Sequence, residues 1–591
     1  MKNLFKALGI REWIYVVCTI GFIVLQVWLD LKSPEFLQLL LKEVQQDGTN
    51  GAVISMAVVW KYGGLMLACV FSSMIAAMIC AFFSGWIAAT VSSNLRARLF
   101  AKVSAFSSVE INRFSTPSLI TRSTNDITQV QMLIAMGLQV IVKAPIMAIW
   151  AIIKIVNLDV GWIIATIIAV VVLVVVLLTL LGIVFPKFTK IQKLTDNVNG
   201  ITRENLTGIR VVRAYNAENY QQKKFSKANA NLTKVQLFSS RTLGFLSPFM
   251  TMVMSGLTLA IYWIAKGIMD KNPSNAVEIG ANIATVTLYA TQVVMAFIML
   301  SFIFLILPRT IVSLRRINEV LKTDSSILDG STPAAAHQQQ GTVTFKNVSF
   351  AYPNASDAIL HNINFTVDKG ETVAFIGATG AGKTSLINLI PRLFDATEGE
   401  VLVNGVNVKE YALADLRDKV AIVTQKAILF SGTIESNVSY GKRSGHTHSI
   451  ENVKKSVEIA QAKNFVEKME ENYNSPVAQG GTNYSGGQRQ RLSIARAIAR
   501  NAEIFIFDDS FSALDYKTDK ELRNALKQEL KDATKLIVAQ RIGTIKDADK
   551  ILVLDEGKIV GMGKHKELLE TCPIYREIAL SQLSEEELHH E

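Results

Sequence analysis

The sequence is poor in the residues from which cysteine-ligated metal centres and disulfide frameworks are built. Its 591 residues include four cysteines, Cys18, Cys69, Cys80 and Cys572. Their spacing suits neither a metal site nor a set of disulfide bonds, and the first three lie inside apolar runs. We therefore expect the cysteines to be packing residues.

Acidic residues are almost absent from six long apolar stretches in the first 310 residues. Half of the chain is hydrophobic and the mean hydropathy is +0.28, which is high for a soluble protein. Each stretch is long enough to cross a hydrocarbon core of roughly 30 Å as a helix. No small-residue cleavage site follows the first stretch, so we expect a retained membrane helix rather than a removed signal peptide. The predicted spans are Trp13–Leu29, Tyr62–Thr90, Met132–Ile153, Gly161–Phe185, Thr242–Ala265 and Ile279–Leu307.

Basic residues outnumber acidic ones, which gives a formal net charge of +11. We expect no nucleic-acid partner, because Lys and Arg gather beside the apolar spans, where flanking a lipid bilayer accounts for them. The loops after the second and fourth spans are the most basic, so the positive-inside rule places both loops and both termini in the cytoplasm. Lys143 interrupts the third span beside Pro145. We expect it to snorkel toward the cytoplasmic end rather than form a buried ion site.

The two basic loops continue the neighbouring spans with polar, helix-favouring sequence. We therefore expect two long helical hairpins that descend into the cytoplasm, where they can contact the cytoplasmic half of the chain. Their predicted turning points are Ser107–Phe114 and Ala214–Glu218. An ordinary solvated loop explains each turning point equally well.

Aromatic and sulphur-containing side chains recur inside the spans. Flexible methionines and broad rings suit an adaptable apolar cavity, although lipid-facing or packing roles are at least as good an explanation for any one residue. The candidates are Phe82, Phe83, Trp86, Phe245, Phe249, Tyr289, Phe297, Met74, Met78, Met250, Met254 and Met295.

A phosphate-binding loop lies between the apolar run 373–376 and a helix-favouring segment. Glycines let its backbone wrap round an oligophosphate, and the following helix points free N–H groups at the charge. Lys383 is expected to reach the β- and γ-phosphates of ATP, and the Thr384 hydroxyl to bind Mg²⁺. The loop reads Gly377, Ala378, Thr379, Gly380, Ala381, Gly382, Lys383 and Thr384.

Further polar residues follow apolar strand-like runs. Asp508 and Asp509 end the run 504–507, at the sheet edge where open parallel sheets bind ligands. Asp508 is expected to hold Mg²⁺, and Asp509 to face the attacking water. Gln425 ends the run 421–424. Tyr352 ends an alternating, strand-like segment, where its ring could stack on a purine or simply pack.

A second anion-binding pattern precedes a helical run. Ser485, Gly486 and Gly487 open a helix N-terminus, followed by Gln488. One domain rarely needs two such surfaces. The economical explanation is that two nucleotide-binding domains meet face to face, each offering its phosphate loop to one ATP and its Ser-Gly-Gly helix to the other.

On these residues the chain resembles an ATP-binding-cassette (ABC) exporter half-transporter over nearly its whole length. The resemblance implies an all-α membrane domain of the exporter type, with coupling helices at the two loop turns, and an α/β P-loop nucleotide-binding domain. It also implies that Tyr352 stacks on adenine, Gln425 links Mg²⁺ to the membrane loops, and Asp515 communicates between two ATP sites. The implied domains are residues 1–322 in the membrane, a linker 323–340, the nucleotide-binding domain 341–585 and a tail 586–591.

Two departures from the family pattern affect the expected catalysis. Asp509 stands where the family has Glu and is one methylene shorter, so it is poorly placed to polarise water. Gln540 stands where the family has His, and it can donate a hydrogen bond to a phosphate but cannot carry a proton. The signature keeps Ser485 through Gln488, with Tyr484 replacing the usual Leu.

This asymmetry resembles one half of a bacterial heterodimeric multidrug exporter in the plasma membrane. This chain would form a slow, degenerate ATP site from Lys383, Thr384, Asp508, Asp509 and Gln540, while its intact signature would complete a competent site on a second half-transporter. The expected cargo is an amphipathic small molecule. Two alternatives stay open: a homodimeric lipid or drug flippase, and a nucleotide-sensing regulatory subunit that transports nothing itself.

Overall fold

The computed structural model describes residues 9–49, 56–271, 276–330, 340–353, 355–441 and 449–583. It divides into two compact units. The helical unit contains the chain up to Ser104 and Pro117–Thr323, and the α/β unit contains Ala105–Thr116 and the chain from Asp324 onward. The predicted tail 586–591 and positions 331–339 of the predicted linker lie outside the described residues.

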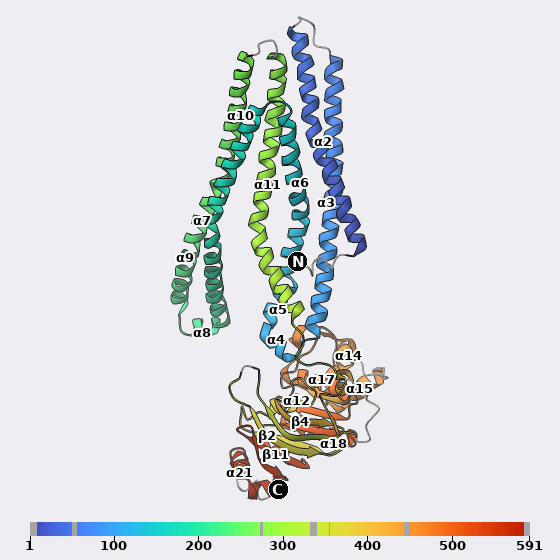
Figure 1. The fold of residues 1–591 in the computed structure, drawn as a ribbon. Coiled ribbons are helices and arrows are strands. Elements are labelled where there is room, and N and C mark those ends of the chain that lie inside the picture. Colours follow the sequence, from blue (N-terminus) through green and yellow to red (C-terminus); the bar gives the residue numbers. More distant parts are fainter. Residues whose placement is uncertain are drawn as a thin grey trace. The chain divides into compact units, whose positions relative to one another are not determined.

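Long helices make up the helical unit (Figure 1). They include six that are long and apolar enough to cross a membrane, which confirms the six predicted spans. At 1.5 Å per residue, the 49-residue α3 is roughly 74 Å long, so it extends well beyond a hydrocarbon core of roughly 30 Å. The helices are α2 (Ile10–Thr49), α3 (Met56–Ser104), α5 (Thr116–Ser123), α6 (Asn125–Val156), α7 (Val160–Thr207), α8 (Ile209–Ala214), α9 (Glu218–Gly244), α10 (Leu246–Lys271) and α11 (Ala276–Lys322).

Helices α2, α3, α6 and α11 pack together, and α7 packs against α9 and α10. Buried Val27, Ala151, Trp162 and Val293 belong to one apolar cluster that joins α2, α6, α7 and α11. Small residues such as Ala151 let the helix backbones approach closely where lipid provides no hydrophobic driving force.

The prediction that Lys143 snorkels is wrong. Its ammonium group lies 3.2 Å from a carboxylate oxygen of Asp30, so the side chain bridges α6 and α2. The Ser73 hydroxyl of α3 donates to the same aspartate. An opposite charge on a neighbouring helix satisfies the lysine within the protein, so it has no need to reach the membrane surface.

Each basic loop contains a short helix at its turn. In the first loop, α4 (Ser108–Phe114) lies at the predicted turning point and is opened by a Ser107 capping box. In the second loop the helix is α8, which ends at Ala214, and a turn at residues 215–217 leads into α9. The second predicted turning point therefore marks this turn, while the short helix precedes it.

The α/β unit contains two main sheets and their covering helices. The strands are β1 (Val343–Phe350), β2 (Leu360–Val367), β3 (Thr372–Gly377), β4 (Glu398–Val403), β5 (Val406–Asn407), β6 (Val420–Val423), β7 (Gly432–Thr433), β8 (Pro476–Val477), β9 (Ile504–Asp508), β10 (Thr534–Val538), β11 (Lys550–Asp555) and β12 (Lys558–Gly563). The α-helices after β3 are α12 (Lys383–Leu389), α13 (Leu413–Lys419), α14 (Ile434–Val438), α15 (Ile450–Ile459), α16 (Lys463–Val466), α17 (Gly486–Ala499), α18 (Tyr516–Glu529), α19 (Ile542–Ile545), α20 (His565–Thr571) and α21 (Pro573–Leu580).

The central sheet has the order β12-β11-β3-β10-β9-β6, and all pairs from β11 to β6 are parallel. Its inner strands are apolar on both faces because helices or the second sheet cover each face. In β9, Phe505 and Phe507 join one core cluster, whereas Ile504 and Ile506 join the other. The second sheet, β2-β1-β4-β5, is antiparallel, as the alternating pattern of β1 predicts.

Candidate functional site

Four adjacent parallel strands end at the same edge of the central sheet. In spatial order, β3 leads into the phosphate loop, β10 is followed by Gln540, β9 ends at Asp508 and β6 is followed by Gln425. Residues separated by more than 150 positions therefore lie at one edge. The strand endings in the sequence predicted this for Gln425, Asp508 and Asp509, whereas Gln540 was assigned to the site through the family resemblance.

The phosphate loop has a backbone that only glycine accommodates at two positions. A Cβ on Gly377 would lie 2.0 Å from the Leu554 carbonyl oxygen. Gly382 has φ of +94°, and a Cβ there would lie 2.7 Å from the Leu360 side chain. These close approaches hold the loop tightly against the strand edge, so its peptide groups form the lining of the site.

Lys383 lies across this loop. Its ammonium group donates to the Gly377 and Ala378 carbonyl oxygens at 2.7 and 2.8 Å. Burial lowers the pKa of Lys383, while Asp509 and Asp508 act in the opposite direction. A buried cation held by two carbonyl groups can exchange them for the oxygens of a phosphate chain.

Thr384 and Asp508 form the oxygen-rich part of the site. The Thr384 hydroxyl lies 3.1 Å from both carboxylate oxygens of Asp508. Burial raises the pKa of Asp508, the Thr384 hydrogen bond opposes this, and the neighbouring Asp509 adds to the rise. A hydroxyl beside a buried carboxylate is a donor set that suits a hard divalent cation.

Asp509 follows β9 in a left-handed backbone conformation, with φ of +44°. One of its carboxylate oxygens accepts hydrogen bonds from two side-chain amides, that of Gln540 at 3.0 Å and that of Gln425 at 3.4 Å. Burial raises the pKa of Asp509, and the Gln425 hydrogen bond opposes the rise. The sequence predicted that these three residues share one site, but not that both glutamines donate to the same oxygen.

Tyr352 lies next to the phosphate-loop helix. Its hydroxyl is 3.0 Å from that of Ser385, and its ring meets those of Phe350 and Phe394 edge to face. The residue is half-buried, so part of the ring stays accessible. Sequence reasoning missed Ser385 and Phe394, although Ser385 directly follows the phosphate-loop motif.

The signature residues form a second cluster in the same unit. Ser485 caps α17, since its hydroxyl accepts from the Gln488 amide at 3.3 Å and the Gln488 side chain accepts from the Ser485 amide at 2.9 Å. Gly487 lies against the backbone of Ala513, two residues before Asp515. Asp515 caps α18 through the Thr518 amide at 3.0 Å, and that hydrogen bond lowers its pKa. The usual leucine position holds Tyr484, which is buried and donates to the Pro476 carbonyl oxygen.

The helical unit contains an apolar pocket of about 510 Å³ between α7, α10 and α11. Three of the predicted methionines, Met250, Met254 and Met295, line it. Other candidates have different surroundings: Phe82 and Trp86 are exposed on α3, whereas Tyr289 is buried and donates to the Leu31 carbonyl oxygen. The remaining lining residues, which sequence reasoning missed, are Leu177, Leu180, Leu181, Leu243, Leu246, Ser247, Thr251, Ile298, Ser301 and Phe302.

Comparison with known proteins matches both parts of the chain. Residues 16–297 fit the model of the ABC transporter transmembrane region, and residues 360–512 fit the ABC transporter model. A solved structure of a bacterial Atm1-family ABC exporter with ATP bound shares the fold, with a TM-score of 0.79 and 24% identity over 96% of this chain and 98% of that one.

Similar curated proteins span both units. An uncharacterized ABC transporter ATP-binding protein of Mycobacterium tuberculosis is 35% identical over 91% of this chain and 92% of its own length. An ATP-dependent lipid A-core flippase of Hahella chejuensis is 33% identical over 69% of each chain. A multidrug resistance ABC transporter ATP-binding and permease protein of Lactococcus lactis is 28% identical over 99% of this chain and 96% of its own.

The matched models, the six spans and the phosphate loop point to the same conclusion. The membrane domain and the ATP-binding domain lie on one polypeptide, and proteins built in this way act as dimers in a lipid bilayer. ATP hydrolysis in this family is coupled to transport. The chain therefore belongs to the ABC transporters, as an exporter half-transporter with one membrane domain and one ATP-binding domain.

Proposed function

We propose that the chain is one subunit of a heterodimeric exporter that moves amphipathic drugs or lipid-like compounds out of a bacterial cell by alternating access. It would span the plasma membrane six times, with both termini in the cytoplasm. The apolar pocket between α7, α10 and α11 supports this substrate class, because its leucines and methionines offer dispersion contacts while Ser247, Thr251 and Ser301 offer hydroxyl groups.

In this proposal the phosphate-loop cluster binds ATP with Mg²⁺. Lys383 would neutralise the phosphates, Thr384 and Asp508 would hold the ion, and Tyr352 would offer its ring to adenine. The pairing of the Thr384 hydroxyl with both oxygens of Asp508 supports the ion site. When bound, the ion supplies positive charge to the phosphate oxygens.

The observation that carries the asymmetric mechanism is the arrangement around Asp509. Its carboxylate is one methylene shorter than glutamate, and one oxygen is occupied by the amides of Gln540 and Gln425. An oxygen that already accepts two hydrogen bonds is a weak base toward water, and neither amide can take up a proton. This chain's own site would therefore bind ATP and turn it over slowly.

The signature cluster keeps Ser485 through Gln488, and its departure from the family pattern, Tyr484, is buried. Ser485 and Gln488 form the complete capping box at the start of α17, a 14-residue helix. This N-terminus would face the ATP bound at the partner's phosphate loop and complete a hydrolysing site there. Closure of the two ATP-binding domains would drive the outward-opening step, and hydrolysis at the partner's site would reset it.

A homodimeric flippase is the competing function. The intact Lys383, Thr384 and Asp508 favour it, since a site that binds ATP in this way retains most of the catalytic environment. In a homodimer, two slow but working sites would face two copies of the signature cluster.

The deciding experiment measures the ATPase activity of the purified chain, alone and co-purified with a candidate partner half-transporter. We expect negligible activity alone and high activity with the partner, and the high activity should survive Asp509→Asn. The variant Asp509→Glu with Gln540→His should raise the activity of the chain alone, by about tenfold or more. Robust activity of the wild-type chain alone, abolished by Asp509→Asn, would establish the homodimer instead.

A further inference from the structure

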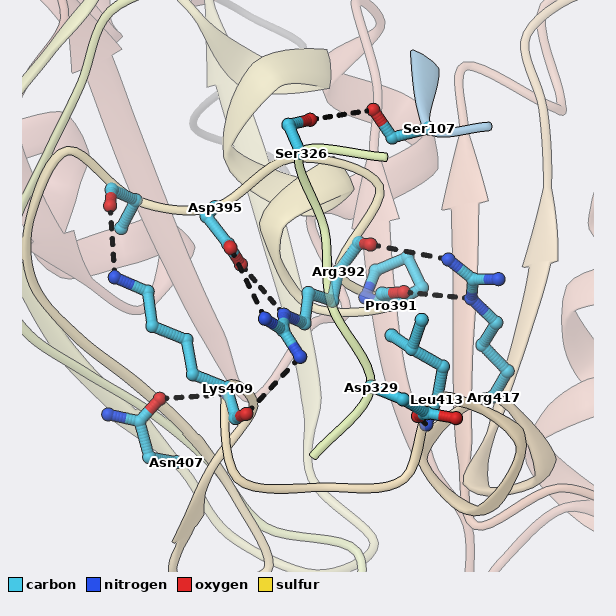
Figure 2. A network of polar contacts seen from close by, with 11 residues as sticks. Ser107, Ser326, Asp329, Pro391, Arg392, Asp395, Asn407, Lys409, Leu413 and Arg417 are labelled. Carbon is cyan, nitrogen blue, oxygen red and sulfur yellow. Dashed lines mark hydrogen bonds and ion pairs between the residues drawn. The ribbon is translucent and has the colours of Figure 1, made fainter. Parts of the chain in front are cut away.

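A short segment of the α/β unit, Asp324–Gly330, connects two parts of the unit that lie far apart in sequence. We call this segment the strap. At its start it contacts α4, the short helix of the first basic loop, and at its end it contacts the start of α13 (Figure 2). All three elements belong to the same compact unit.

At α4, the strap is held by a buried carboxylate. One oxygen of Glu110 accepts from the Ser107 amide and hydroxyl at 3.0 and 2.5 Å, which caps the helix. The other oxygen accepts from the Ser326 amide at 3.1 Å. The Ser107 and Ser326 hydroxyl groups lie 3.0 Å apart. Glu110 therefore divides its two oxygens between the helix and the strap.

The charge on Glu110 is maintained by these hydrogen bonds. Burial acts to raise the pKa of Glu110, but the hydrogen bonds from Ser107 and Ser326 together hold it below its ordinary value. A buried carboxylate that accepts three hydrogen bonds is rigidly placed, because losing any one leaves the charge poorly compensated. On the same helix, Val109 packs against the core cluster beside β1 and β3.

At the other end, the strap caps α13. The Leu413 amide, at the first residue of that helix, donates to the Asp329 carboxylate at 2.5 Å. The Gly330 amide donates to the Tyr411 carbonyl oxygen at 2.9 Å. A Cβ on Gly330 would lie 2.2 Å from the Glu410 carbonyl oxygen, so only glycine fits this close approach.

Helix α13 in turn contacts the chain at the end of the phosphate-loop helix α12. The Arg417 guanidinium donates to the carbonyl oxygens of Pro391 and Arg392, both at 3.4 Å. Arg392 also donates to the Lys409 carbonyl oxygen at 3.2 Å, in the segment that leads into α13 (Figure 2). The hydrogen bonds thus run from α4 through the strap and α13 to the end of the helix that begins with Lys383.

We infer that Glu110 and Asp329 are positioning residues that transmit ATP binding at the phosphate loop to the first coupling loop through the strap. Neither touches the nucleotide-binding cluster described above. ATP binding would shift α12, Arg417 and Asp329 would move the strap with it, and Glu110 would move α4. This inference requires only that the chain binds ATP, so it holds for a heterodimer and for a homodimer.

The test uses the full-length chain in lipid nanodiscs, with hydrogen–deuterium exchange of α4 and α5 measured with and without Mg²⁺-ATP. The variants are Glu110→Gln, which replaces one of the two acceptor oxygens by a donor without changing the size of the side chain, and Asp329→Ala, which removes the oxygen that accepts from the Leu413 amide. Glu451→Gln is the control, because it makes the same change of carboxylate to amide at an exposed position of α15, which takes no part in this path. ATP affinity is measured for every protein with a fluorescent nucleotide.

We expect both carboxylate variants to keep ATP affinity within about twofold of wild type and to lose about two thirds or more of the ATP-dependent change in exchange at α4. Glu451→Gln should retain that change. The inference is overturned if both carboxylate variants show the same ATP-dependent change in exchange as wild type. It is also overturned if both variants lose ATP affinity together with that change, because the strap would then only support the fold of the ATP site. If one of the two variants keeps the full ATP-dependent change in exchange at α4, the residue substituted in that variant does not transmit ATP binding to α4.

Discussion

The two clusters of the α/β unit differ in how they hold their polar groups. In the phosphate-loop cluster, Lys383, Asp508 and Asp509 are partly or fully buried. Burial lowers the pKa of Lys383 and raises the pKa of Asp508 and Asp509, which in each case favours the neutral form. In the signature cluster, Ser485 and Asp515 cap exposed helix ends, and the pKa of Asp515 is lowered by the Thr518 amide. The first cluster therefore holds buried charges that a ligand must compensate. The polar groups of the second cluster already have hydrogen-bond partners without a ligand.

Under the proposed function, this difference bears on the substitutions that each cluster would tolerate. Asp509 and Gln540 lie in the first cluster, where the proposal assigns ATP binding mainly to Lys383 and the loop backbone, so ATP would still bind with these two residues in place of Glu and His. The second cluster depends on helix-capping geometry, which Ser, Asp, Asn and Thr provide and apolar residues do not. In the proposed heterodimer, a subunit with a slow site of its own would therefore still complete the partner's site.

The largest effect is expected for Lys383→Ala. Removing the buried cation leaves the phosphate charge uncompensated, so ATP affinity of the isolated chain should fall by about 100-fold. Equilibrium binding of a fluorescent ATP analogue measures this. Affinity within a few-fold of wild type would show that the loop backbone alone binds the phosphates, and would weaken the contrast between the clusters.

An intermediate effect is expected for Ser485→Ala in the complex with a partner subunit. ATPase activity should fall by about tenfold or more while ATP affinity of the isolated chain is unchanged, because the serine would act at the partner's site. Ser449→Ala is the matched control. Ser449 also caps a helix of the same unit, through the Asn452 amide at 3.2 Å. Each variant therefore loses one helix cap, which lowers the free energy of unfolding by about 1 kcal/mol. Equal loss of activity in the two variants would assign Ser485 a purely structural role.

The smallest effect is expected for Asp508→Asn without nucleotide. The folded-state pKa of Asp508 is raised from its ordinary value of 3.8, so the folded state holds a proton more readily than the unfolded state. Its contribution to stability is therefore greatest at low pH and declines as the pH rises from about 3.8 through the folded-state pKa. At pH 7 the neutral Asn should raise the melting temperature of the ligand-free chain by about 1–2 °C.

The same variant should abolish the extra stabilisation by Mg²⁺ in the presence of ATP, because its side chain no longer supplies a carboxylate ligand. Thermal scans with ATP, with and without Mg²⁺, measure this. A Mg²⁺-dependent shift as large as that of wild type would exclude Asp508 from the ion site.

Features encoded in short, continuous stretches could be predicted from the sequence. The six spans follow from uninterrupted hydropathy, and the order of strand and loop around Lys383 follows from one motif. The endings of separate strands placed Gln425 and Asp509 at one edge, because parallel strands share their carboxyl edge, whereas Gln540 was assigned to the site only through the family resemblance.

Contacts between residues distant in sequence could not be predicted in the same way. Lys143 was misinterpreted because its partner, Asp30, lies on another helix more than 100 positions away. Glu110 and Asp329 belong to no motif, and each carboxylate has many exposed counterparts in the chain. Only the packed structure shows that one is buried against the strap and that the other caps α13.

The Lys143–Asp30 pair also bears on how the protein enters the membrane during synthesis. A lone lysine near the centre of a span opposes insertion by about 2.5–3.5 kcal/mol. Asp30 lies on α2, which leaves the ribosome long before α6. The third span can thus find its counter-ion on a helix that is already in place, so assembly of the first helices would precede, and assist, the insertion of the third.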